Sequence, residues 1–304
     1  MPDAISHIET AETLMKEFAD RTGVSSDKTP VRYLWTDAFA VCNFFSLADI
    51  TGNDDYHKLA IGLIDQVHGV LGKHRDDDSR SGWISGLDEE EGSQHPTKGG
   101  LRIGKPLPER NPEDSFDQRK EWERDGQYFH YLTKWMHALD IAAQRTGEEK
   151  YEMWASEMAK TAANAFTYEV AGGQTLMYWK MSIDLSRPLV PSMGHHDPLD
   201  GYITIKQIQS GMSEFEENEK NLNLETEAQT FKNMLKGRNW ITPDPLGLGG
   251  LLIDATRLSQ LMVKDDSDDV GLLSDLLHAA GRGIEHWQLS GMLDYPSHQR
   301  LAFR

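Results

Sequence analysis

Residues 123–130 concentrate groups that can transfer protons and bind hydroxyls. They read Glu-Arg-Asp-Gly-Gln-Tyr-Phe-His and lead into an apolar run that predicts a helix. A carboxyl group buried at the start of such a helix can have the raised pKa of a general acid, and Gln127, Tyr128 and His130 can form hydrogen bonds with a sugar. We therefore expect Asp125 to be catalytic. The alternative is that it only caps the helix.

Asp37 has a corresponding position in Trp35-Thr36-Asp37, at the start of an earlier apolar run. Two carboxylates in one site suit cleavage of a glycosidic bond, because one protonates the leaving oxygen while the other activates water or attacks the sugar. We expect Asp37 to be a second catalytic carboxylate and Trp35 to face the sugar. Capping of the helix is again the alternative for Asp37.

A further group of polar and aromatic residues lies in two stretches, 178–184 and 194–202, of which the second is punctuated by Gly and Pro. His196 is a candidate general base, as in an epimerase that removes a proton next to a carbonyl, and Asp197 is another candidate carboxylate. A plain turn capped by Asp197 is the alternative. We expect no metal here, because adjacent imidazoles rarely point at one ion. The candidate substrate-binding residues of this group are Trp179, Lys180 and His195.

Two other tryptophans lie in segments punctuated by Gly or Pro. Trp83 stands in Ser-Gly-Trp-Ile-Ser-Gly, and Trp240 begins Trp-Ile-Thr-Pro-Asp-Pro. Both are candidate sugar-binding residues, since an indole face packs well on the C–H face of a pyranose. For Trp83, the alternative is that it anchors its own loop.

An internal repeat predicts the helices that must position these residues. The pattern Thr-Gly-x-x-x-Tyr at 51–56 returns at 146–151. After each copy, apolar residues recur with the spacing of a helix buried on one face. Before each copy, residues 38–50 and 127–143 are apolar on nearly all sides, which predicts a fully buried helix. Each repeat is therefore an inner helix, a Thr-Gly turn whose glycine can end that helix, and an outer helix.

Weaker copies of this pattern continue along the chain, so we expect about four helical hairpins. Such hairpins can close into a ring or stack as a solenoid, and their uneven length favours the ring. The fold expected is all-α, with short strands possible near residues 176 or 203. The weaker copies are 251–263 with 273–287, 199–208 with 215–235, and 8–18 without a partner.

One long insertion, at about residues 75–124, separates the first two repeats. It is rich in Gly, Pro and charge and has no helical period. Loops of this length usually serve function or are disordered. We expect a single domain over 1–304, with the insertion at the mouth of the ring.

This pattern resembles the six-hairpin glycosidase-like superfamily, the (α/α)6 toroids. The resemblance rests on Trp35-Thr36-Asp37, the two Thr-Gly-x-x-x-Tyr turns and residues 124–128, Arg-Asp-Gly-Gln-Tyr. It implies a sugar bound in the mouth of the ring by aromatic side chains, with acidic or histidine catalysts near the starts of the inner helices. Members include glycoside hydrolases, unsaturated glucuronyl hydrolases, polysaccharide lyases and sugar 2-epimerases. The chain holds fewer than six evident hairpins, so we expect an incomplete ring or a truncated chain.

Composition narrows the possible partners. The net charge of −18 disfavours nucleic acid and anionic membranes. Cys42 is the single cysteine, which excludes an intrachain disulfide. No signal peptide or spanning segment is evident, so we expect a cytoplasmic protein. We expect no cofactor and no metal, and a small sugar or oligosaccharide as the partner.

The function expected from the sequence is a carbohydrate-active enzyme, most simply one that resembles glycoside hydrolases and uses paired carboxylates in a central cavity. Two alternatives remain open: a sugar epimerase or isomerase with a histidine base, and a non-catalytic carbohydrate-binding or scaffold protein.

Overall fold

The computed structural model describes residues 4–212, 223–265 and 269–296, most of which are helical. The helices are α1 (Ala4–Arg21), α2 (Leu34–Thr51), α3 (Asp54–Leu71), α4 (Glu89–Gln94), α5 (Gln118–Glu123), α6 (Phe129–Thr146), α7 (Glu149–Phe166), α8 (Asp197–Met212), α9 (Glu225–Leu235), α10 (Pro245–Asp265) and α11 (Val270–Leu289), with a 3-10 turn at Met292–Asp294. The strands are β1 (Gln127–Tyr128), β2 (Thr167–Val170), β3 (Gln174–Met177), β4 (Lys180–Met181) and β5 (Pro188–Val190).

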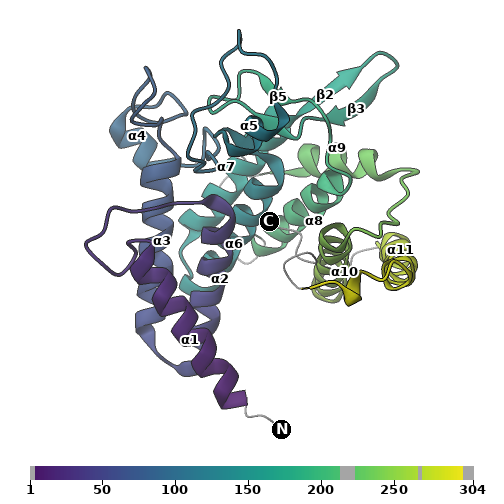
Figure 1. Cartoon of the computed structure of the whole chain (residues 1–304), viewed down its shortest axis with the longest axis horizontal. Coiled ribbons are helices and arrows are strands. Elements are labelled where there is room, and N and C mark those ends of the chain that lie inside the picture. Colours follow the sequence, from purple (N-terminus) through teal and green to yellow (C-terminus); the bar gives the residue numbers. More distant parts are fainter. Residues whose placement is uncertain (1–3, 213–222, 266–268, 297–304) are drawn as a thin grey trace.

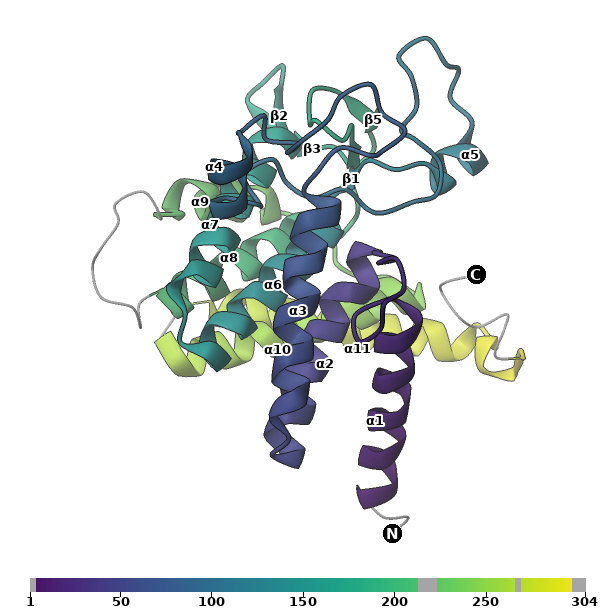
Figure 2. The same ribbon diagram turned by 90° about the vertical axis from the view of Figure 1, so that its left-hand side faces the viewer.

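The long helices form four hairpins: α2 packs on α3, α6 on α7, α8 on α9 and α10 on α11. The first members of these hairpins also pack on one another in chain order, α2 on α6, α6 on α8 and α8 on α10. We call α2, α6, α8 and α10 the inner helices. Helix α1 lies against α2 (Figures 1 and 2). The hairpins predicted from the repeat are therefore present, although residues 215–222 of the third predicted pair lie outside the described residues.

The turns of the two strongest repeats have the predicted conformation. Gly52 and Gly147 adopt φ values of 68° and 70°, in the left-handed region that favours glycine. Their backbone N–H groups donate to Ala48 O at 2.9 Å and Ala143 O at 2.8 Å. Each inner helix of these repeats thus ends in a cap that lets the outer helix turn back immediately.

A buried histidine joins the first two hairpins. Trp135 on α6 donates its Nε1–H to Nε2 of His68 on α3 at 3.1 Å, and the Trp154 ring on α7 lies 4.9 Å from the same imidazole. Burial lowers the pKa of His68 to about 3, so the imidazole is neutral and can accept this bond. The packed rings fix α3, α6 and α7 relative to one another.

The inner helices are less completely buried than their composition predicts. Ile50 on α2 is 61% exposed and Ile253 on α10 is 51% exposed. These helices are the two ends of the row, and within the described residues no extensive packing joins α10 to α2. The expectation of helices buried on all sides was wrong for these two, because each lacks an inner neighbour on one side.

The strands and short helices gather at one end of the helical body, where α3 ends and α6 begins (Figures 1 and 2). Antiparallel pairing gives a sheet in the order β1-β4-β5 and a separate hairpin β2-β3. A strand predicted near residue 176 is confirmed as β3, whereas residue 203 lies in α8. Among the described residues, no helix is long and apolar enough to cross a bilayer.

Candidate active site

Aromatic side chains meet where α2 and α6 begin. We call this group the aromatic cluster. Its rings come from the starts of two inner helices, from α5 of the insertion and from the segment before β4. Its members are Tyr33, Trp35, Trp122, Tyr128, His130, Tyr131 and Trp179.

The rings of the aromatic cluster are in mutual contact. The centroids of Trp35 and Tyr131 are 5.0 Å apart, those of Tyr128 and Trp179 are 5.2 Å apart, and His130 stacks on Trp179 at 5.8 Å. Trp122 is 45% exposed, and Trp35, His130 and Trp179 are half-buried. The cluster therefore reaches the surface. Four residues predicted to bind substrate, Trp35, Tyr128, His130 and Trp179, come together here.

Two tyrosines of the cluster were missed by sequence reasoning. The hydroxyls of Tyr33 and Tyr131 form a hydrogen bond of 2.5 Å. Burial raises the pKa of Tyr131 far above its usual range, so this phenol stays protonated. In the sequence, only their position close to Trp35 and His130 at the helix starts could have indicated that these tyrosines belong to the site.

His130 combines a neutral ring with an unused nitrogen. Burial lowers its pKa to about 4, which leaves the imidazole uncharged at neutral pH. Its Nδ1 is buried and has no hydrogen-bond partner within the described residues. Lys134 lies one helical turn further along α6 and also lowers the pKa of His130. His130 therefore links the aromatic cluster to the charged groups described next.

Three inner helices contribute a buried group of charges beneath His130, here called the carboxylate cluster. At its centre, Asp200 accepts hydrogen bonds from Lys134 Nζ at 2.7 Å, Arg257 Nη1 at 3.2 Å and the hydroxyl of Thr133. Burial alone would raise the pKa of Asp200, but the two cations and these bonds hold it to about 2. Its members are Lys134 on α6, Asp197 and Asp200 on α8, and Asp254 and Arg257 on α10.

Two other carboxyl groups of the carboxylate cluster have raised pKa values, in contrast to Asp200. Burial, followed by the charge of Asp200, raises the pKa of both Asp197 and Asp254 to about 7. Asp197 lies in the first turn of α8 and accepts a bond from Gly194 N at 3.1 Å. An ionised carboxylate and two carboxyls that hold a proton near neutral pH thus occupy one cluster, a combination typical of acid–base sites.

A second imidazole lies at the start of α8. His196 stacks on Trp240 with centroids 6.0 Å apart, and exposed His195 lies 4.6 Å from it. Burial lowers the pKa of His196 to about 4, although a hydrogen bond to the backbone of Trp240 acts in the other direction. Nε2 of His196 is buried without a partner among the described residues. This nitrogen is free to accept a proton.

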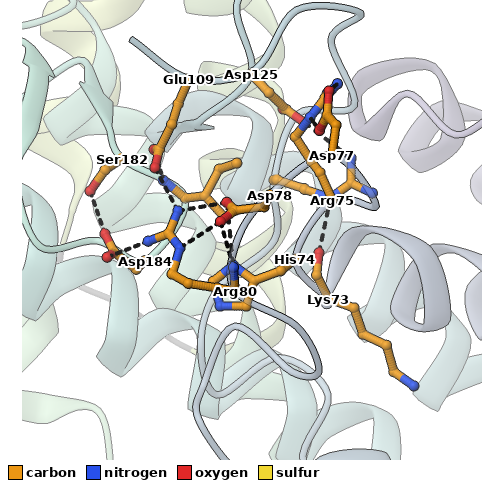
Figure 3. Close-up of polar contacts among 12 residues, drawn as sticks. Lys73, His74, Arg75, Asp77, Asp78, Arg80, Glu109, Asp125, Ser182 and Asp184 are labelled. Atoms are coloured by element: carbon orange, nitrogen blue, oxygen red, sulfur yellow. Dashed lines mark hydrogen bonds and ion pairs between the residues drawn. The ribbon is translucent and has the colours of Figure 1, made fainter. Parts of the chain in front are cut away.

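Asp125 is held in buried ion pairs. It is completely buried and accepts bonds from Arg102 Nη1 at 3.0 Å, Arg75 Nη1 at 3.3 Å and Gly104 N at 2.9 Å. Two guanidinium groups therefore neutralise this carboxylate and fix its orientation. The sequence suggested catalysis or capping, and the structure instead places Asp125 in an ion-pair network (Figure 3).

Asp37 lies in the first turn of α2, whose N-cap residue is Tyr33, so it is not the capping residue that the sequence suggested as the alternative. It accepts a bond from Tyr33 N at 2.9 Å at the start of α2, and Arg32 Nε lies 3.8 Å away. Burial raises the pKa of Asp37 to about 7 despite Arg32. The carboxyl lies under the backbone of the aromatic cluster and positions Tyr33.

Three other predicted substrate-binding residues hold the insertion in place. Trp83 is 6% exposed, and its ring packs so closely on Gly92 that a Cβ there would lie 2.2 Å from it. Gln127 Nε2 donates to Gly99 O at 2.9 Å and Ile183 O at 2.6 Å. Lys180 is fully buried and is described below with its partner Glu121.

Lys180 donates three hydrogen bonds, to Glu121 Oε1 at 2.9 Å, Glu121 O at 2.8 Å and Arg124 O at 2.8 Å. All of its protons are therefore used inside the protein. Arg110 Nε completes the pair by donating to Glu121 Oε2 at 3.0 Å. Lys180 thus supports Tyr128, whose ring centroid lies 5.3 Å from Nζ.

Arg80 joins the insertion to the loop after β4. Figure 3 shows its guanidinium group between three carboxylates, Asp78 at 2.8 Å, Glu109 at 2.7 Å and Asp184 at 2.6 Å. Together with Arg75 and Arg102, it gives residues 75–124 an ordered structure without a large apolar core. The insertion is consequently an ordered segment that lies beside the aromatic cluster.

No group of three or more potential ligand side chains lies close enough to hold a metal ion within residues 4–212, 223–265 and 269–296. Comparison with known proteins finds no match to any family model, curated protein or solved structure. The geometry of the site therefore carries the functional argument alone.

Proposed function

We propose that the chain is a carbohydrate-active enzyme that binds a sugar at the aromatic cluster and cleaves a glycosidic bond with Asp197 as the proton donor. One observation carries this proposal: the charge of Asp200 acts both on His130 of the aromatic cluster and on Asp197, whose pKa is raised to about 7. Half-buried indole and phenol rings suit the C–H faces of pyranoses, and a carboxyl with a raised pKa suits donation to a leaving oxygen.

The two clusters are physically connected. His130 belongs to the aromatic cluster, and Lys134, one turn along the same helix, is bonded to Asp200. The charge of Asp200 acts on the pKa of both His130 and His196 and helps to raise that of Asp197. In this proposal Asp197 donates the proton, and the negative charge of Asp200 helps to keep Asp197 protonated beforehand.

The neutral His196 supplies the base in this proposal. Its unpartnered Nε2 can accept a proton from the water that attacks the sugar. The water oxygen bonds to the anomeric carbon, the glycosidic bond breaks, and the leaving oxygen receives the Asp197 proton. Water is consumed and no redox partner is required.

We further propose that the row of inner helices is an arc of an (α/α) toroid, related in architecture to the six-hairpin superfamily. The chain-order packing of α2, α6, α8 and α10, each with its hairpin partner, supports this. The position of the aromatic cluster at the starts of α2 and α6 also supports this proposal, because the resemblance implies sugar-binding aromatic side chains at the mouth of the ring.

The test is hydrolysis of a panel of methyl glycosides and disaccharides, whose leaving alcohols need a proton, by the wild type and by Asp197→Asn. We expect the variant to lose about 10²–10⁴-fold in kcat/KM. Wild-type activity should fall as pH rises through about 7, because Asp197 then loses its proton. Asp37→Asn is the matched control: it removes a carboxyl of similar pKa in the first turn of α2 that accepts a bond from Tyr33 N, so it should lower stability and keep the pH profile. Full activity in a folded Asp197→Asn variant would refute the role of Asp197.

Epimerisation is the second candidate, favoured by the free nitrogens of neutral His130 and His196. It predicts that sugar protons exchange with solvent without hydrolysis. Incubation of sugars in heavy water, followed by mass spectrometry, separates the two reactions. Deuterium in an otherwise intact sugar would replace the hydrolase proposal by this one.

A further inference from the structure

One lysine beside the aromatic cluster, Lys105, has no anionic partner among the described residues. Nζ of Lys105 lies 5.1 Å from the centroid of the Trp122 ring and 5.4 Å from that of Tyr33. These are cation–π distances. Within the described residues the ammonium group makes no ion pair and no side-chain hydrogen bond. Its side chain is half-buried, in a protein of net charge −18.

The backbone of Lys105 is held rigidly. Arg75 donates from Nη1 to Lys105 O at 2.7 Å and from Nη2 to Pro106 O at 3.0 Å, and Gly104 N donates to Asp125 at 2.9 Å. The ion-pair network drawn in Figure 3 therefore fixes the segment that carries this lysine. Such support is expected of a group that has to meet a ligand in one position.

A second cation of this region is fully neutralised. Lys180, whose Nζ lies 5.3 Å from the centroid of the Tyr128 ring, is paired with Glu121. Glu121 is also engaged by Arg110, so it is not available to Lys105. Among the described residues, Lys105 is thus a cation at the edge of the aromatic cluster without an ion-pair partner, and an anionic group on a bound molecule would neutralise it.

We propose that the ligand is an acidic saccharide, whose carboxylate or sulfate group binds Lys105 while its sugar ring packs on the aromatic cluster. This inference rests on the proposed function, because it names the substrate class of the same site. A neutral sugar would leave the ammonium group with its ring contacts alone, so the lysine discriminates by charge. The bond formed is a charge-assisted hydrogen bond, which is stronger than a neutral one.

The experiment measures binding by calorimetry at millimolar ligand concentration. The ligands are matched: methyl glucuronide, glucose 6-sulfate and methyl glucoside, with both anomers of the methyl glycosides. The proteins are the wild type, Lys105→Gln and Lys98→Gln. Lys98 is an exposed lysine of the same insertion, so the control variant changes the net charge equally.

We expect the wild type to bind at least one acidic ligand about tenfold more tightly than the neutral one, equivalent to about 1.4 kcal/mol. Lys105→Gln should abolish that preference and leave the affinity for methyl glucoside within about twofold, whereas Lys98→Gln should keep it. The preference should shrink as salt is raised, because the contact is partly open to solvent. The carboxylate and sulfate arms show which anion is recognised.

Two results would overturn the inference alone: equal wild-type affinity for acidic and neutral sugars, or a preference that survives in Lys105→Gln. In both cases sugar binding, and with it the proposed function, would stand. If no sugar binds the wild type, the proposed function fails together with the inference.

Discussion

Replacing Lys180 by methionine should destabilise the protein strongly without touching a ligand. Lys180 and Glu121 are 0% and 3% exposed, and the variant would leave two buried carbonyls and one carboxylate without the donor that now serves them. Breaking a buried ion pair from one side typically costs about 3–5 kcal/mol. At roughly 2–4 °C per kcal/mol for large domains, Tm should fall by about 6–20 °C.

Thermal unfolding followed by circular dichroism measures this change. The double variant Lys180→Met with Glu121→Gln should lose less stability than the sum of the single variants, because it removes both charges together. Lys98→Gln should stay within about 0.5 kcal/mol of the wild type. An unchanged Tm in Lys180→Met would show that this ammonium group is not buried in the pair, and its assignment to support rather than to substrate would be wrong.

Two further changes probe the insertion. Arg80→Gln removes the guanidinium that joins three carboxylates; we expect about 1 kcal/mol of local destabilisation and about fivefold faster proteolysis within residues 75–124. Unchanged cleavage would contradict the role of Arg80. Gly104→Ala should cost about 2–3 kcal/mol, because φ is 88° and the new Cβ would lie 2.2 Å from Arg32 O. By contrast, Gly62→Ala, in open space on α3, should stabilise by about 0.5–1 kcal/mol. Equal melting temperatures for the two alanine variants would refute the steric argument.

The helical hairpins could be predicted because their signals are local. The spacing of apolar residues and the glycine turns at Gly52 and Gly147 determine each hairpin within a few dozen residues. The same logic places Trp35 and His130 near the starts of neighbouring inner helices, so it brought part of the aromatic cluster together. Trp179 joins them through the pairing of β1 with β4, which helical periodicity cannot reveal.

Roles that depend on distant partners could not be predicted. Asp125 looks like a helix-start acid in sequence, but its ionic partner Arg75 lies 50 positions earlier. Lys180 looks like a loop cation, yet Glu121 is 59 positions away. Periodicity carries no information on such pairs. The partner of a side chain nevertheless decides whether its role is catalytic or structural.

The carboxylate cluster had a signal in the sequence. Asp254 and Arg257 interrupt the apolar stretch at residues 251–263. Two charges three positions apart share a helical face, and in α10 that face is buried against Asp200. A charged pair inside an apolar helix is better interpreted as an indication of a polar interior site.

The bonds between Arg80 and Asp184 have a consequence for the order in which the protein matures. The first hairpin needs only neighbouring residues, and nascent chains generally fold from the N-terminus. The insertion beside the aromatic cluster, however, can complete its contacts only after residues 179–190 have left the ribosome. These residues then dock on a segment synthesised about a hundred residues earlier. A growing chain would thus carry its first two hairpins before the aromatic cluster is complete.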